Sequence, residues 1–239
     1  MTLLFFLLAA ACVSLATPFT VGPRTNGPRT NKLNYRISPV DGSKIALPTK
    51  EQLAFQDKEI GVLIHLDVAT YLNLDGCNGD PTLVPDINLF DPSSLNTDQW
   101  IESIADLTGK FATLVAKHNC GFATWPSKVT FQTRDDKTVA YDYTIAQSPV
   151  AGTDLVKNLV DSAESRGIGH GLYYSVVWNN YLNVEDSHVR SEALSPGQVG
   201  ITNDTYNQIV FDQLTELWSH YGNLTEVGFT DDGGFMLPH

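Results

Sequence analysis

The chain has 239 residues, of which 42% are apolar, and this share is enough for the packed core of a globular protein. Its net charge is −12, with no basic stripe, which argues against a nucleic-acid partner. The length suits one large domain or two smaller ones.

The first sixteen residues predict a signal peptide. The apolar run that begins the chain is shorter than the roughly 20 residues that span a bilayer. Ser14 and Ala16 are small residues at the positions that a signal peptidase reads, so we expect cleavage after Ala16. A buried N-terminal helix is the alternative, since no Lys or Arg precedes the run. We therefore expect a secreted, extracellular protein without a membrane partner.

Cysteine usage and glycosylation motifs agree with secretion. Cleavage would remove Cys12 and leave Cys77 and Cys120, which we expect to form a disulfide between loops on one face of the fold. Neither cysteine belongs to a Cys-x-x-Cys pair, which argues against a zinc site, and the sequence indicates no cofactor. Asn203-Asp-Thr205 and Asn223-Leu-Thr225 are N-glycosylation motifs.

Residues 17–50 are rich in Pro, Gly, Thr and Asn, and this composition predicts a leader segment with a short strand around 33–37. From residue 51 to 239 the pattern is that of one domain in which apolar runs alternate with stretches of helical spacing. The expected strands are 60–66, 111–118, 169–176 and 226–232, and the expected helices are 96–107, 153–163 and 203–218. Such alternation predicts parallel strands joined by right-handed crossovers.

Polar residues at the strand ends favour a barrel over a doubly wound sheet. His65, His118, Ser175 and the pair Asp231 and Asp232 stand at the carboxyl ends of four successive strands. A barrel gathers all of these ends around one site, whereas a doubly wound sheet gathers those beside its switch point. We expect an α/β fold of the (β/α)8 TIM-barrel type.

Four strands are half of the eight that close such a barrel. The domain is therefore expected to comprise about the first four β/α units. A truncated gene model, a fragment, and a chain that pairs with another half all remain open.

The residue types at the strand ends indicate a sugar site. Histidine and asparagine donate hydrogen bonds to hydroxyl groups, and aromatic rings stack on sugar faces. Tyr173 and Tyr174 alternate along a strand, so one should point inward and the other toward the helices. Trp125 either contributes to the site or forms a hydrophobic lid.

Several segments, in the same order, resemble the α-L-fucosidases of glycoside hydrolase family 29. The similar segments are Pro48–Gln56 with Gly61–His65, Phe90-Asp-Pro92 leading to Asp98-Gln-Trp100, Ala116-Lys-His-Asn-Cys-Gly-Phe122 with Trp125-Pro-Ser127, Gly171-Leu-Tyr-Tyr-Ser175, and Tyr221-Gly222 with residues 226–234. The resemblance covers roughly residues 45–235. Where the family has a second histidine and an aspartate, this chain has Asn119 and Cys120.

The resemblance implies a retaining glycosidase that releases terminal α-L-fucose from oligosaccharides or glycoconjugates. Such enzymes use two carboxyl groups about 5 Å apart, one as nucleophile and one as acid/base. The nucleophile would stand at the end of the fourth strand. Aligning the Asp-Gly-Gly motif with the family's nucleophile motif favours Asp232, whereas aligning the residues of the strand favours Asp231. Counting from Glu226 without a gap in the alignment selects Thr230. The acid/base glutamate of the family follows that strand, and no residue of this sequence is assigned to it.

The same resemblance implies that His65, His118, Asn119, Trp125 and one tyrosine of the 173/174 pair bind the sugar. Two other functions remain open. One is a catalytically inactive, fucose-binding fragment or pseudoenzyme, suggested by the substitutions at 119 and 120. The other is an unrelated barrel hydrolase or isomerase that uses a metal at His65 and His118.

Overall fold

The computed structural model describes residues 35–229. The predicted signal peptide and the two candidate nucleophiles, Asp231 and Asp232, lie outside these residues. The chain divides into two units, residues 1–49 and residues 50–239. In the first unit, strands β1 (Tyr35–Ile37) and β2 (Lys44–Ala46) form an antiparallel hairpin, of which the sequence predicted only the first strand.

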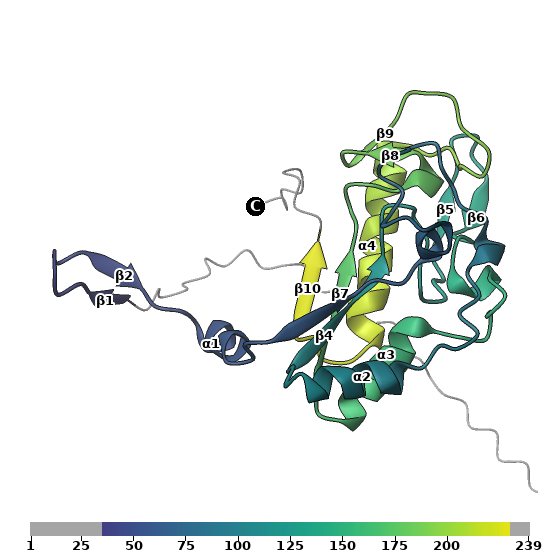
Figure 1. Cartoon of the computed structure of the whole chain (residues 1–239). Helices are drawn as coiled ribbons and strands as arrows, with labels where there is room; N and C mark the ends of the chain where they lie inside the picture. The colour runs from purple at the N-terminus through teal and green to yellow at the C-terminus, as the bar shows by residue number, and fades with distance from the viewer. Residues whose placement is uncertain (1–34, 230–239) are drawn as a thin grey trace, which may run out of the picture. The chain divides into compact units, whose positions relative to one another are not determined.

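The second unit is built on a four-stranded parallel sheet (Figure 1). Its strands, in both chain order and sheet order, are β3 (Gly61–Ile64), β4 (Phe111–Lys117), β7 (Gly169–Tyr174) and β10 (Glu226–Phe229). These are the four strands that the apolar runs predict, so the parallel sheet is confirmed. β4 lies inside the sheet and is buried along nearly its whole length, which explains its continuous apolar sequence.

The three predicted helices are confirmed, and a short one precedes them. They are α1 (Lys50–Gln56), α2 (Thr97–Asp106), α3 (Leu155–Ser165) and α4 (Asn203–His220). Asn96, Asp154 and Thr202 act as N-caps, because each side-chain oxygen accepts a backbone N–H of the first turn. Gly222 follows α4 with a φ of 76°, a left-handed conformation that suits the end of a helix.

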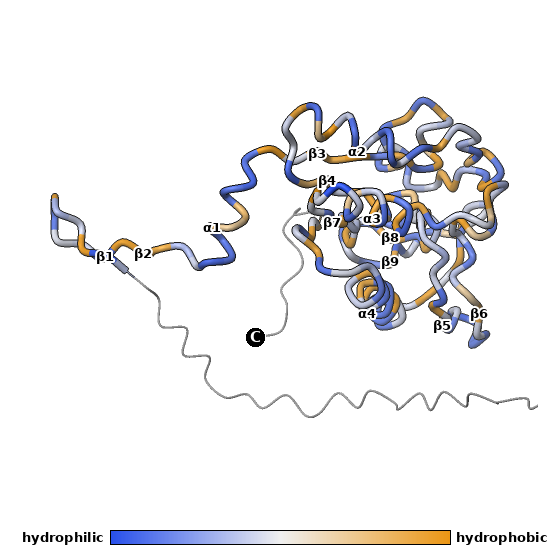
Figure 2. Tube along the Cα trace, turned by 90° about the horizontal axis from the view of Figure 1, so that it is seen from below, coloured by the Kyte–Doolittle hydropathy of each residue, from blue (hydrophilic) through white to orange (hydrophobic). Residues whose placement is uncertain are grey.

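Helices α2, α3 and α4 cover one face of the sheet (Figures 1 and 2). Each strand is added to the sheet beside the previous one, always on the same edge. Right-handed crossovers then place every connecting helix on the same face of the sheet. Leu114, Leu172 and Tyr174 point from the strands into the core beneath these helices. On the other face, Thr113 of β4 donates a hydrogen bond to Glu226 of β10.

The connections carry structure that periodicity did not reveal. The stretch predicted as a polar loop after β4 contains a hairpin of β5 (Thr130–Gln132) and β6 (Thr138–Ala140). After β7 comes a second hairpin, of β8 (Val184–Glu185) and β9 (His188–Val189). Strands of two or three residues are too short to show an alternating pattern, which is why sequence analysis missed them. Four 3₁₀ helices complete the connections: η1 (Val68–Leu72), η2 (Ile87–Leu89), η3 (Ile145–Gln147) and η4 (Asn180–Leu182).

Within residues 35–229 the sheet remains open, with β3 and β10 as its edges, and no closed barrel is present. The strand order does not reverse, so this sheet has no switch point of the kind that defines a doubly wound fold. None of the helices in the described part of the chain is long and apolar enough to cross a membrane.

Candidate functional site

Three predicted site residues meet where β3, β4 and β7 end. His65 follows β3, His118 follows β4, and Tyr173 is the penultimate residue of β7. The rings of His65 and His118 lie edge to face with centroids 4.5 Å apart, and the rings of His118 and Tyr173 have centroids 6.1 Å apart. Parallel pairing of the three strands brings these side chains to one edge, and we call them the strand-end cluster.

A buried carboxylate supports His65, and sequence analysis missed it. Oδ2 of Asp67 lies 3.3 Å from Nε2 of His65, while Oδ1 accepts the backbone N–H of Ala69. Asp67 is the N-cap of η1, and Thr70 completes a capping box with it. An aspartate three residues before a threonine is a helix-start signal, so this position could have been recognised in the sequence.

The electrostatic surroundings of His118 keep its ring neutral. Burial, together with a smaller effect of the neighbouring His65, lowers the pKa of His118 to about 4. A neutral imidazole has one nitrogen that donates a hydrogen bond and one that accepts, which is the pattern needed to bind sugar hydroxyls. His65 is more exposed, with 28% of its side chain accessible, so the cluster opens to solvent on that side.

Asn119 lies behind the cluster and holds a loop. Its Oδ1 accepts the backbone N–H of Cys77 at 2.7 Å, and the residue is buried. The predicted disulfide between Cys77 and Cys120 is confirmed, with Cα atoms 5.0 Å apart. Asn119 and the disulfide therefore fasten the β3–α2 loop to the end of β4, immediately after His118.

Tyr174 and Trp125 lie on the helix side of the sheet and not with the cluster. The hydroxyl of Tyr174 donates to Gln213 of α4 at 2.7 Å, and its ring lies 6.5 Å from that of Trp125. Trp125 is 1% exposed and donates its indole N–H to Glu216 of α4 at 2.9 Å. The prediction that the two tyrosines face opposite sides is confirmed, and Tyr173 is the one beside His118.

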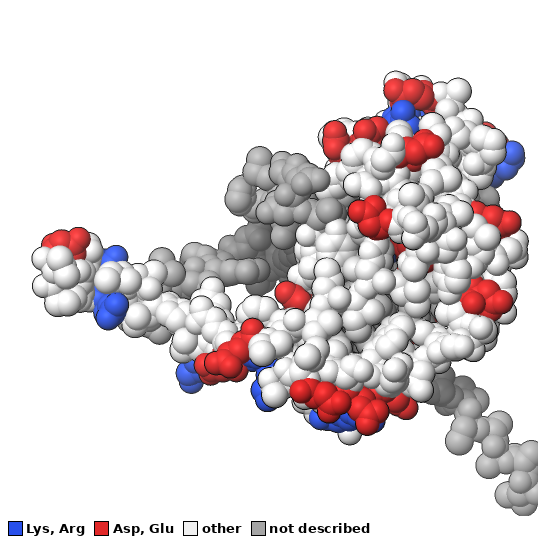
Figure 3. Space-filling model, viewed as in Figure 1, with Lys and Arg blue, Asp and Glu red and all other residues white. Residues whose placement is uncertain are grey.

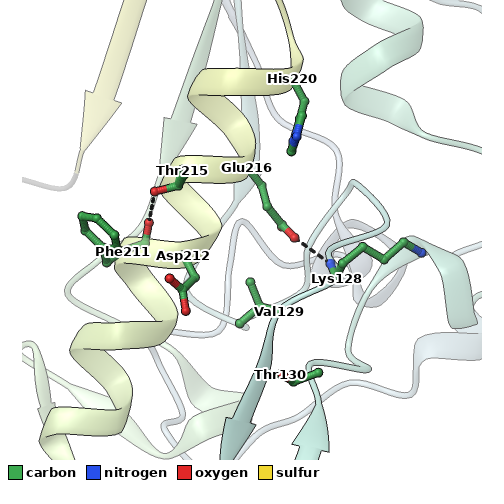
Figure 4. A pocket seen from close by; sticks show the side chains of 8 residues that line it. All are labelled: Lys128, Val129, Thr130, Phe211, Asp212, Thr215, Glu216 and His220. Carbon is green, nitrogen blue, oxygen red and sulfur yellow. Dashed lines mark hydrogen bonds between the residues drawn. The ribbon is translucent and has the colours of Figure 1, made fainter. Parts of the chain in front are cut away.

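Glu216 also accepts the backbone N–H of Lys128 at 2.7 Å, which joins α4 to the segment before β5 (Figure 4). A shallow groove runs along this junction. It is lined by Lys128, Val129, Thr130, Phe211, Asp212, Thr215, Glu216 and His220. Because the groove lies on the helix side of the sheet, it is separate from the strand-end cluster.

Lys117 is a second residue that sequence analysis did not single out. It is fully buried, and desolvation lowers its pKa to about 7. Its Nζ donates to the carbonyl of Ser175 at 2.6 Å and lies 4.2 Å from the ring centre of Tyr174. Lys117 therefore joins the ends of β4 and β7, which carry His118 and Tyr173.

The strand-end cluster also contains a set of possible metal ligands. His65, Asp67 and His118 each offer one ligand atom, and these atoms all lie within 4.8 Å of one another. Two imidazoles and a carboxylate suit zinc and similar divalent ions. The arrangement can thus either bind sugar hydroxyls or coordinate a metal.

Comparison with known proteins decides the family. A family model described as alpha-L-fucosidase matches residues 83–234. The chain belongs to the α-L-fucosidase family. The matched residues include His118, Tyr173 and strand β10, so most of the strand-end cluster falls within the match.

Two related proteins show how far the likeness extends. The chain is 29% identical over 185 residues to alpha-L-fucosidase 1 of Arabidopsis thaliana, which covers 77% of this chain and 30% of that protein. A crystal structure of a glycoside hydrolase 29 family member from an unknown rumen bacterium is 29% identical, with a TM-score of 0.60 over 78% of this chain and 28% of that one. The chain thus spans less than one third of the length of both proteins.

Proposed function

We propose that the chain supplies the sugar-binding wall and the nucleophile of a retaining α-L-fucosidase. The observation that carries the proposal is the meeting of His65, His118 and Tyr173 at the carboxyl ends of three adjacent parallel strands. Family membership supports α-L-fucosides as the substrate class. The proposed substrate is terminal α-L-fucose on oligosaccharides or glycoconjugates.

The cluster has the chemistry to hold a sugar. A neutral His118 can form a hydrogen bond with a sugar hydroxyl group through Nε2, because its Nδ1 is buried in the protein. Oδ2 of Asp67 lies 3.3 Å from Nε2 of His65, and this close contact holds that ring in place, which leaves its other nitrogen, Nδ1, for the ligand. The ring of Tyr173 offers an apolar surface next to His118, against which the carbon face of fucose packs.

We assign the nucleophile to Asp232, with Asp231 as the alternative. The Asp-Gly-Gly sequence at residues 232–234 supports this assignment. In the proposed mechanism the carboxylate of Asp232 attacks the anomeric carbon while the glycosidic bond breaks, and the leaving group takes a proton from the acid/base residue. Water, deprotonated by the same residue, then hydrolyses the glycosyl ester and frees both the fucose and Asp232.

The complete enzyme on this proposal is a (β/α)8 barrel, to which this sheet contributes four strands. The consecutive strand order and the helices on one face support it. The acid/base residue then comes from outside the described part of the chain. We also infer that the protein is secreted, which the disulfide supports because such bonds persist in oxidising compartments.

The test is fucose release from an aryl α-L-fucoside by the native protein and two variants. We expect Asp232→Asn to abolish release and Asp231→Asn to keep it, and the first sugar detected by NMR to be the α-anomer. The matched pair differs by one position, so a general loss of folding would affect both. The opposite pattern would move the nucleophile to Asp231, and an initial β-anomer would exclude a retaining mechanism.

The second candidate is a fucose-binding protein without turnover. The observation that favours it is Asn119, which replaces a family histidine and whose side-chain oxygen is used by the backbone of Cys77. Calorimetry that detects fucose binding, together with no release from any fucoside, would establish this function and exclude the enzyme.

A further inference from the structure

Strand β4 contains a bulge at its carboxyl end, directly before His118. Val115 pairs with Tyr173 of β7, but the next residue of β7, Tyr174, pairs with Lys117, so the register shifts by one residue between 115 and 117. We call the two residues that cause this shift, Ala116 and Lys117, the β4 bulge. A bulge changes the direction of the side chains that follow it, and bulges are common beside active sites.

The β4 bulge reverses the faces to which Lys117 and His118 point. Val115 pairs with Tyr173 and shares its face, so strict alternation would turn Lys117 to that face and His118 toward the helices. The structure shows the opposite arrangement. Nζ of Lys117 lies 4.2 Å from the ring centre of Tyr174, on the helix side, whereas the ring of His118 lies beside that of Tyr173. The bulge is therefore what brings His118 into the strand-end cluster.

Two sets of hydrogen bonds hold the β4 bulge in place. The carbonyl of Ala116 accepts the backbone N–H of Thr124 at 3.0 Å and the hydroxyl of Thr124 at 2.9 Å. Lys117 contacts Ser175 twice: its carbonyl accepts the backbone N–H of Ser175 at 2.9 Å, and its Nζ donates to the carbonyl of Ser175 at 2.6 Å. The side chain and the backbone of Lys117 thus fix the end of β4 against the end of β7.

The burial of Lys117 is unusual for a lysine. In the view of Figure 3, the Lys and Arg side chains that are visible on residues 50–229 lie near the margins, where water solvates them. Lys117 is 0% exposed instead. Burying an amino group costs free energy that an apolar side chain would not require, and the cost is offset where the group finds a partner. The hydrogen bond from Lys117 to Ser175 is that partner, which gives the lysine a role besides packing.

We propose that Lys117 is a positioning residue of the sugar site. From the helix side of the sheet its amino group holds the β4 bulge, and the bulge directs the ring of His118 toward Tyr173 on the opposite face. Lys117 acts through His118 and does not touch the sugar, because the sheet lies between them. The effect on fucose rests on the proposed function, whereas the effect on the direction of the His118 ring does not.

The test compares Lys117→Met with Tyr174→Phe in the full chain. Methionine is nearly as long as lysine but has no donor, whereas phenylalanine keeps the ring beside Lys117 and loses the hydroxyl that donates to Gln213. Each variant loses one buried hydrogen bond on the helix side, so a general loss of stability affects both. The two readouts are the nuclear Overhauser effect between the rings of His118 and Tyr173, and the Kd for L-fucose measured by calorimetry. We expect Lys117→Met to lose the ring contact and to raise the Kd at least about tenfold, and Tyr174→Phe to keep both.

The outcomes separate this proposal from the proposed function. An unchanged ring contact in a folded Lys117→Met variant, or an equal loss in both variants, would overturn the role of Lys117. If the native protein shows the ring contact but binds no fucose, the proposed function fails, and the ring contact still tests Lys117. If circular dichroism shows that Lys117→Met is unfolded, Thr124→Val replaces it, because this change removes the hydroxyl that donates to Ala116. Thr124→Val should weaken the ring contact, and an unchanged contact there would overturn the proposal.

Discussion

Removal of the disulfide between Cys77 and Cys120 should produce a large loss of stability. The bond closes a loop with a sequence separation of 43 residues. The chain-entropy relation for a loop of this length gives about 4 kcal/mol at 25 °C, which is the freedom that the unfolded chain would regain. Both cysteines are buried, so alanine is the replacement that avoids an unsatisfied buried hydroxyl.

The assay is urea unfolding of the double variant Cys77→Ala/Cys120→Ala, followed by tryptophan fluorescence and compared with the native protein. We expect the free energy of unfolding to fall by about 4 kcal/mol and the urea dependence to increase, because the unfolded chain exposes more surface. If the variant is unfolded at 25 °C without urea, the loss equals or exceeds the native stability, which agrees with the estimate. If the free energy of unfolding falls by less than about 1 kcal/mol, the disulfide does not stabilise the fold by restricting the unfolded chain, and the reasoning is refuted.

Three further perturbations have defined outcomes. The pKa of folded His118, about 4, lies below the ordinary histidine value of 6.5, so proton binding favours the unfolded chain. The free energy of unfolding should therefore hold above about pH 6.5 and fall as the pH drops toward 4. The variant His118→Gln should flatten that part of a pH series of urea midpoints. Gly171→Val should destabilise the sheet by about 1–3 kcal/mol, since a Cβ there would lie 2.7 Å from the Thr113 hydroxyl, whereas an unchanged melting temperature would contradict this packing. A strong chelator should leave fucose release unchanged if His65 and His118 bind sugar, and loss of release that zinc restores would instead favour the metal site.

The parallel sheet could be predicted from the sequence because each strand and helix carries its own local signal, and the same strand–helix pattern recurs along the chain. The buried strand β4 reads as an unbroken apolar run, and helices α2 and α3 begin at side chains with strong capping chemistry, Asn96 and Asp154. The convergence of His65 and His118 followed from the same pattern, since parallel strands bring their carboxyl ends to one edge. Secretion and glycosylation stay predictions.

Other parts of the site depend on tertiary contacts that no local pattern encodes. Trp125 belongs to a motif that resembles a sugar-binding segment, but Glu216, far away in the sequence, draws its indole to the helix side of the sheet. The polar character of Asn119 indicated a ligand contact, whereas the fold uses its oxygen to hold the Cys77 backbone. Lys117 went unnoticed because a lysine at the end of a strand is normally exposed, and only the packing of Tyr174 and Ser175 around it shows otherwise.

The most direct test of the account is an NMR titration of the histidine rings with L-fucose. If the strand-end cluster binds the sugar, the imidazole signals of His65 and His118 shift together and saturate, while those of the exposed His188 on β9 stay constant. D-glucose at the same concentrations should leave all three rings unchanged. Rings of His65 and His118 that respond no more than the ring of His188 would contradict the claim that these strand ends form a fucose site.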